Sequence, residues 1–173
     1  MGETTLRDII VRARGLTRAE LVEELGPLVL IGPKPEDAAR PSVFQYTTEH
    51  AKRSGPSPIE QLLDGAVHRL VKRDGGRLTD LLLVGRASSN DVVVEDASIS
   101  KLHARISVDP QGAFRIVDAK STNGTFVGAR QLGEGESVAL RPGAELRLGD
   151  VTLRIHETKT LLEIASRFQL ATI

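Results

Sequence analysis

The sequence predicts an all-β sandwich with a helical segment before it and a short helix after it. From Leu81 onward the chain is a series of short apolar or alternating runs, such as LLLVGR, HARISVD and AFRIVDA. Turn signals, among them PQG, GEGE and RPG, lie between these runs. Closely spaced short strands are typical of a sandwich. The first 26 residues instead repeat apolar side chains at helical spacing.

Composition limits the class of protein. A chain of 173 residues suits one domain with extensions, and its 40% apolar residues are enough for a core. The 23 Lys and Arg balance the 23 Asp and Glu, so no net field draws the chain to nucleic acid or to a membrane. The absence of cysteine excludes disulfides and thiolate zinc sites. The charged start and the lack of an apolar run of about 18 residues predict a cytoplasmic protein.

Two helices and a strand are expected in the first 32 residues. The first helix closes at Gly15, and the second begins with the capping-box pair Thr17 and Glu20. The run LVLIG then predicts a short strand. Five of the eight prolines follow between residues 32 and 58, which indicates a linker with a possible strand at residues 42–48.

The segment SPIEQLLDGAVHRLVKR can be interpreted in two ways. Ser57 as an N-cap and Pro58 in the first turn predict a helix. The apolar pattern would extend this helix to Arg73, yet AVHRLVK also alternates like a strand. Periodicity alone does not decide between them.

Three loops between the later strands carry similar polar groups. The first follows Gly85-Arg86 and runs through ASSND, the second is ASISKLHAR, and the third is DAKSTNGTF. Gathered at one end of a sandwich, they would offer a guanidinium, an ammonium, hydroxyls, an amide and backbone N–H groups. This is the chemistry of an anion site, because the planar fork of arginine suits phosphate oxygens.

The three blocks resemble the forkhead-associated (FHA) domain, a β-sandwich that reads phosphothreonine. The family pattern is Gly-Arg, then Ser-x-x-His, then Asp-x-x-Ser-x-Asn-Gly-Thr. Here these blocks are Gly85-Arg86, Ser100 to His103 and Asp118 to Thr125. The resemblance covers roughly residues 67–156. It implies an FHA-type (SMAD/FHA-like) β-sandwich of about 11 strands.

The resemblance also implies how the chain is divided. The family needs a strand ahead of the Gly-Arg strand, so a short helix ending near Gly65 and a strand over residues 66–72 are favoured. The expected units are a helical or irregular N-terminal extension with a Pro-rich linker over 1–65, the FHA domain over 66–156, and a helical tail over 157–173.

The resemblance assigns roles to the phosphate-binding residues. Those predicted to bind the phosphopeptide are Arg86, Ser100, Lys101, Ser121, Thr122 and Asn123. Arg86 and Ser100 hold the phosphate. Lys101 adds charge and a backbone N–H, with simple solvation as the alternative. The family prefers phosphothreonine to phosphoserine because the γ-methyl fits a small pocket.

The third loop contributes both contacts and support. Thr122 occupies a position that faces the phosphate or the methyl group, with the alternative that Ser121 turns inward to brace the loop. Asn123 holds the peptide main chain. The residues predicted to support the site are Gly85, His103, Asp118, Gly124 and Thr125.

The predicted function is phosphothreonine-dependent binding of a peptide or protein, as an adaptor or regulator in Ser/Thr kinase signalling, with a Ser/Thr kinase as a further partner. No catalytic residue, metal or cofactor is expected, because no histidine pair has metal-ligand spacing and no nucleotide loop or nucleophile motif is present. The alternative is a scaffold that uses the FHA fold without phosphate.

The start of the chain allows two interpretations. GETTLRD resembles the Glu-Thr-Thr motif of some bacterial FHA regulators, in which a phosphothreonine folds back onto the same domain. The sequence favours the other interpretation, that Thr4 or Thr5 caps the first helix, because Asp8 follows Thr5 at a capping spacing.

Overall fold

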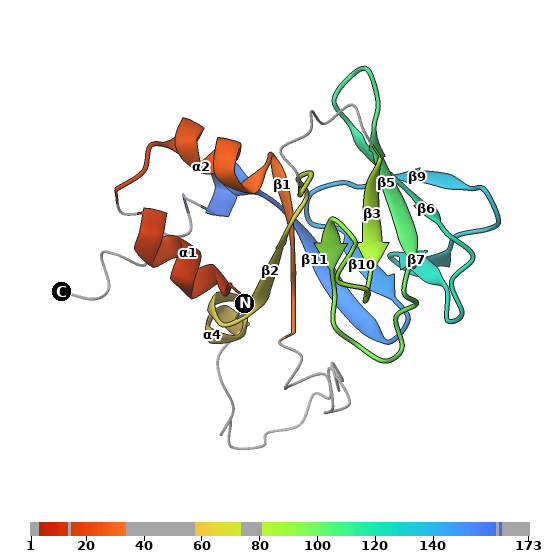
Figure 1. Cartoon of the computed structure of the whole chain (residues 1–173). Helices are drawn as coiled ribbons and strands as arrows, with labels where there is room; N and C mark the ends of the chain where they lie inside the picture. The colour runs from red at the N-terminus through yellow and green to blue at the C-terminus, as the bar shows by residue number, and fades with distance from the viewer. Residues whose placement is uncertain (1–3, 14, 34–57, 74–80, 162, 164–173) are drawn as a thin grey trace, which may run out of the picture.

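Two β-sheets face each other in the computed structural model, which describes residues 4–13, 15–33, 58–73, 81–161 and 163 (Figure 1). The six-stranded sheet has the order β2 (Ala66–Arg69), β1 (Leu28–Gly32), β11 (Val151–Glu157), β10 (Glu145–Leu148), β7 (Thr125–Val127) and β8 (Arg130–Gln131). The five-stranded sheet has the order β4 (Val92–Val93), β3 (Leu82–Gly85), β5 (Ala104–Val108), β6 (Phe114–Asp118) and β9 (Ser137–Ala139). The expected sandwich is confirmed.

The main core lies between the sheets and is built from alternate positions on the strands. Ile106 and Ile116 from one sheet, and Leu146 and Leu153 from the other, are fully buried there. Alternation at period two turns these side chains inward and leaves polar neighbours outside. The sparse aromatic content fits this core, in which Phe114 is the only aromatic residue among those that the structure describes.

Strand β1 is buried on both of its faces. Leu28 and Leu30 pack into the main core, while Val29 and Ile31 face the helices. Two buried faces explain the continuous apolar run LVLI, which does not alternate. The segment falls within the expected extension, yet it pairs with both β2 and β11. The division of the chain at residues 65 and 156 remains a prediction.

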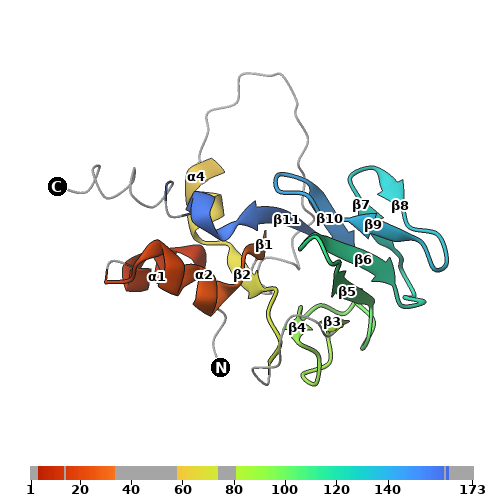
Figure 2. The same ribbon diagram turned by 90° about the horizontal axis from the view of Figure 1, so that it is seen from above.

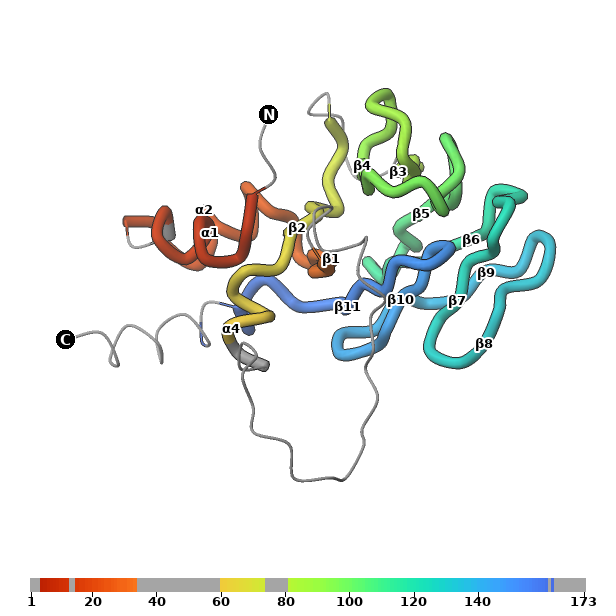
Figure 3. Tube along the Cα trace, turned by 90° about the horizontal axis from the view of Figure 1, so that it is seen from below, coloured from red at the N-terminus to blue at the C-terminus, as the bar shows by residue number. Residues whose placement is uncertain are grey.

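Three helices lie on the side of β1 and β2, away from β7, β8 and β9 (Figures 2 and 3). They are α1 (Leu6–Ala13), α2 (Arg18–Leu25) and α4 (Pro58–Leu63). Their apolar side chains form a second core with β1 and with Leu161 from the start of the tail. None of the helices in the described part of the chain has the length and apolar character that a membrane crossing requires.

The helix caps agree with the sequence. Thr17 and Glu20 form the expected capping box, and Gly26 ends α2. The hydroxyl and the N–H of Thr5 both donate to the carboxylate of Asp8, and Thr5 also bridges to Ala66 at the edge of β2. The Asp8 N–H in turn donates to the Thr5 hydroxyl oxygen at 3.2 Å. In this structure Thr5 therefore caps α1, as the second interpretation of the N-terminus expected.

The ambiguous segment is a helix followed by a strand. α4 ends at Leu63 and β2 begins at Ala66, although β2 ends at Arg69, before the expected residue 72. The strand β8 has only two residues, both exposed, so no apolar pattern in the sequence indicates it. The possible strand at residues 42–48 lies outside the described residues.

Strand directions bring the polar loops to one end of the sandwich. β3 and β6 both run antiparallel to β5, where Ala104 pairs with Val84 and with Asp118. The end of β3, the start of β5 and the end of β6 therefore lie together. Thr125 of β7 pairs with Leu148 of β10, which adds the turn between β10 and β11 to the same end.

Candidate functional site: a loop cluster at one end of the sandwich

The loop after β3 begins at Gly85 and carries Arg86. Backbone bonds hold it against the loop before β5: the Arg86 N–H donates to Ser100 O over 3.1 Å, and the Ala87 N–H donates to Lys101 O over 3.2 Å. A Cβ on Gly85 would lie 2.4 Å from Lys101 O, so only glycine permits this approach.

The loop before β5 is braced from beneath by a buried histidine. His103 is 0% exposed. Its Nδ1 accepts the Ser100 N–H at 3.1 Å, which leaves the proton on Nε2 to be donated to Gly124 O, also at 3.1 Å. One ring therefore joins two loops.

Burial lowers the pKa of His103, although the bond to Gly124 and the charge of Asp118 oppose this. The folded state thus favours the neutral ring, which is the form that the observed hydrogen bonds require.

The loop after β6 is organised by Asp118. Its carboxylate accepts the Ser121 N–H at 2.9 Å and the hydroxyls of Ser121 and Thr125, each at 2.6 Å. Partial burial acts to raise the pKa of Asp118, but the hydrogen bonds from Ser121 and Thr125 outweigh it and lower the pKa. Asp118 is therefore an ionised brace.

Ser121 is turned inward, and Thr122 is turned toward the neighbouring loop. The Ser121 hydroxyl donates to Asp118 and accepts the Gly124 N–H at 3.0 Å. The Thr122 N–H donates to Ser100 Oγ at 3.0 Å, and the two hydroxyl oxygens of Ser100 and Thr122 lie 3.4 Å apart. This geometry favours the alternative in which Ser121 braces the loop.

Asn123 closes the cluster on its other side. Its side-chain N–H donates to Ser98 O at 2.7 Å, while the residue stays exposed. The following Gly124 has a φ of +83°, and a Cβ there would lie 2.6 Å from Gln131 Nε2. The Asn-Gly pair is therefore needed for the shape of the loop as well as for its amide.

Two cations of the cluster are uncompensated. Arg86 and Lys101 are both exposed, and among the described residues no hydrogen bond or ion pair engages the guanidinium of Arg86 or the ammonium of Lys101. Lys120 differs, because Glu134 pairs with it at 2.9 Å. Two free cations beside the hydroxyls of Ser100 and Thr122 form a surface suited to a phosphate group.

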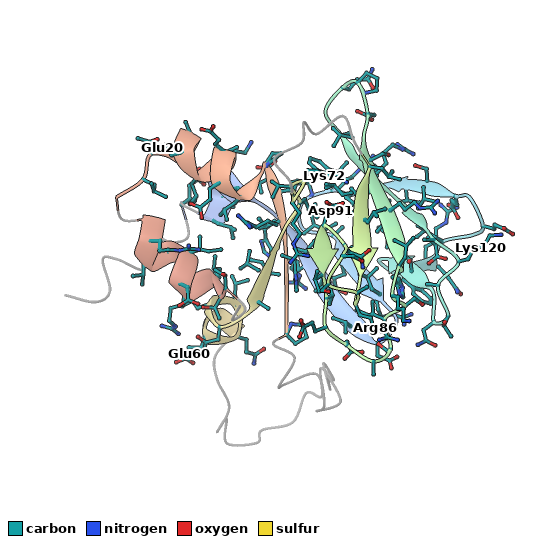
Figure 4. The ribbon with its side chains drawn as sticks, viewed as in Figure 1. Glu20, Glu60, Lys72, Arg86, Asp91 and Lys120 are labelled. Atoms are coloured by element: carbon teal, nitrogen blue, oxygen red, sulfur yellow. The ribbon has the colours of Figure 1, made fainter. Side chains whose placement is uncertain are left out.

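The structure brings together every residue that the sequence singled out. Figure 4 shows Arg86 near one end of the ribbon. Sequence reasoning missed Asn90, which is 3% exposed and donates to Ala87 O at 3.0 Å and Lys101 O at 2.6 Å. Loop asparagines often bond the nearby backbone, but the reach to Lys101 is a tertiary contact that spacing does not reveal. Among the described residues, no group of three or more His, Asp or Glu side chains lies close enough together to hold a metal ion.

Known proteins are similar to parts of this chain. A family model for the FHA domain matches residues 82–149. The glycogen accumulation regulator GarA of Mycolicibacterium smegmatis is 26% identical over 159 residues, which cover 88% of this chain and 86% of GarA. An oxoglutarate dehydrogenase inhibitor of Corynebacterium glutamicum is 27% identical over 65% of this chain and 84% of its own length. Among solved structures, an FHA domain from Chlamydia trachomatis superposes with a TM-score of 0.45 at 25% identity, over 53% of this chain and 85% of that domain.

Proposed function

The chain is an FHA-domain protein, and from that premise we propose that it binds phosphothreonine-containing segments of partner proteins. It acts as a cytoplasmic adaptor or regulator downstream of a Ser/Thr kinase. The observation that carries the proposal is that Arg86 and Lys101, whose side-chain cations have no bonding partner among the described residues, belong to the same loop cluster as the hydroxyl pair of Ser100 and Thr122. A phosphate adds about −1.5 to −2 charges at pH 7, which these two cations can match.

Each residue of the cluster has a part in the proposed complex. Arg86 and Lys101 supply positive charge, and the hydroxyls of Ser100 and Thr122 donate to phosphate oxygens once they exchange their mutual contact for the ligand. Asn123 binds the peptide main chain through its side-chain carbonyl oxygen, which accepts no hydrogen bond from any described residue, since its N–H is bonded to Ser98.

The remaining predicted residues act from beneath. His103, Asp118, Ser121 and Thr125 use their polar atoms within the loops. Their contribution is to fix the loop backbones before the ligand arrives, which reduces the entropy lost on binding.

The names of the relatives support a regulatory role. One is a regulator of glycogen accumulation, and the other is an inhibitor of oxoglutarate dehydrogenase. Both names describe proteins that act on other proteins or processes. Phosphothreonine binding of this kind requires no catalytic residue and no cofactor of this chain.

A binding titration tests the proposal. A fluorescent phosphothreonine peptide library and its unphosphorylated twin are titrated with the full chain, and binding is followed by anisotropy. Selective binding of the phosphorylated form is expected. Arg86→Ala should weaken it by about 2–5 kcal/mol, as expected when one partner of a desolvated charge pair is lost.

Arg141→Ala is the matched control. Arg141 is an exposed arginine between β9 and β10, at the opposite end of β10 from the loop cluster, so the variant removes the same charge without touching the site. Equal affinity for the phosphorylated and unphosphorylated peptides, or an affinity that Arg86→Ala does not change, would refute the phosphothreonine proposal. Either result would favour a phosphate-independent scaffold.

A further inference from the structure

The segment that follows β2 reaches across to the loop that carries Arg86. Lys72 Nζ lies 2.9 Å from Asp91 Oδ2 and donates to Leu81 O at 3.0 Å. The Asp91 carboxylate also accepts the N–H groups of Leu83 at 2.8 Å and Arg73 at 3.3 Å. Figure 4 shows the labelled residues Lys72 and Asp91 side by side.

The ion pair at the base of this contact is well shielded. The side chains of Lys72 and Asp91 are only 23% and 8% exposed, in contrast to pairs such as Lys120 with Glu134 at 82% and 79%. Burial acts to raise the pKa of Asp91, but hydrogen bonds from Leu83 and Lys72 outweigh it and lower the pKa. A shielded carboxylate that accepts hydrogen bonds from three donors is held in one position by the fold.

Arg73 connects the Lys72–Asp91 ion pair to the loop that carries Arg86. Its guanidinium donates to Ser88 O and, at 3.2 Å, to Asn90 O. The side chain of Asn90 then bonds to Ala87 O and Lys101 O. A continuous set of hydrogen bonds therefore runs from Arg73 to the backbones of both loops that hold the free cations.

We propose that Arg73, anchored through Asp91 and Lys72, is a positioning residue for phosphopeptide binding. Arg73 holds Ser88 and Asn90, in the second half of the loop that carries Arg86. The Arg86 guanidinium therefore lies in its binding position before the ligand binds. This inference rests on the proposed function. It adds that residues 72 and 73, which lie outside the stretch of 82–149 matched by the family model, tune the affinity of the site.

The physical reason is the lack of support for Arg86 itself. No described residue bonds to its guanidinium, so the backbone of residues 86–91 alone decides where that group lies. A loop released at Ser88 and Asn90 would explore more conformations and lose more entropy on binding. Arg73→Ala should weaken phosphopeptide binding about tenfold, a typical coupling for residues in one hydrogen-bond network.

The matched control is Arg69→Ala. Arg69 is an exposed arginine on the same segment, and its guanidinium donates to Glu24 O at 3.4 Å, on α2 rather than on the loop. Both variants remove one positive charge. Arg73→Ala removes two arginine-to-carbonyl contacts, to Ser88 O and Asn90 O, and Arg69→Ala removes one, to Glu24 O. The change in long-range electrostatics is therefore the same in the two, and Arg73→Ala differs in losing its contacts with the loop that carries Arg86. Arg73→Lys, which keeps a donor at this position, should recover part of the affinity.

Two measurements on the full chain decide the matter. Anisotropy with the phosphothreonine peptide gives the affinity, and amide hydrogen exchange without peptide gives the protection of residues 86–90. We expect Arg73→Ala to lose affinity and protection in this loop, while Arg69→Ala stays within about twofold of the wild type. Equal affinity and equal protection in the two variants would overturn the proposal.

The two proposals fail in different ways. If the wild-type chain does not select the phosphorylated peptide, the proposed function is wrong, and hydrogen exchange alone still decides whether Arg73 orders the loop. If the wild type binds but Arg73→Ala binds equally well with a more mobile loop, the function stands and the positioning role is refuted.

Discussion

Replacing Asp118 by asparagine tests whether the loop after β6 depends on an ionised brace. The carboxylate accepts three hydrogen bonds, two from Ser121 and one from the fully buried Thr125. Asparagine keeps one acceptor oxygen but places an NH₂ group where the other oxygen was. One of the three donors must then lose its partner, and the others bond to a neutral group.

The size of the effect follows from these contacts. A hydrogen bond to a charged group contributes about 1.5–3 kcal/mol, against about 0.5–1.5 kcal/mol for a neutral one. Losing one charged bond and weakening two, with some relaxation because Asp118 is only half-buried, gives an expected loss of about 2–3 kcal/mol in the free energy of unfolding.

Urea denaturation followed by circular dichroism measures this loss at pH 7. Asp109→Asn is the control, because Asp109 Oδ1 accepts two backbone N–H groups in an exposed turn and asparagine retains that acceptor. We expect less than about 1 kcal/mol for the control. Equal losses in the two variants would refute the reasoning.

The stability that the Asp118 carboxylate contributes depends on pH. The pKa of Asp118 is lower in the folded state than the ordinary value of 3.8. The stability that its carboxylate contributes is therefore fully present above pH 3.8 and is lost as the pH falls through the folded-state pKa. The difference between the wild type and Asp118→Asn should shrink over that range, and a difference that stays constant would contradict the ionised brace.

Two further predictions concern the other supports of the site. Burial lowers the pKa of His103, so its stabilising contribution is present above pH 6.5 and is lost as the pH falls through the folded-state pKa; an NMR titration midpoint at or above 6.5 would disprove this. Gly85→Ala would place a Cβ 2.4 Å from Lys101 O, which should cost about 1–3 kcal/mol of stability and shift the Lys101 amide signal. Gly133→Ala, whose Cβ would meet Glu136 at an ordinary 3.5 Å, should change neither, and an unchanged Gly85→Ala would show that the loops do not need this approach.

Local signals in the sequence were sufficient for most elements. The capping box of Thr17 and Glu20 located α2, and alternating runs located the strands of the sandwich, because these patterns depend on neighbours within a few residues. The three loop motifs identified Arg86 and its partners as one group. The short strand β8 carries no such pattern, since both of its residues are exposed.

The tertiary structure decided what depends on distant contacts. The sequence by itself determined the sandwich, the helical layer and the polar residues of three loops, because periodicity, caps and turn chemistry are local. Only the folded chain placed β1 between β2 and β11, turned Ser121 inward to Asp118, and joined Arg73 to Ser88 and Asn90. These outcomes depend on pairing and hydrogen bonds between segments that spacing along the chain does not relate, so they emerge only when the sheets pack.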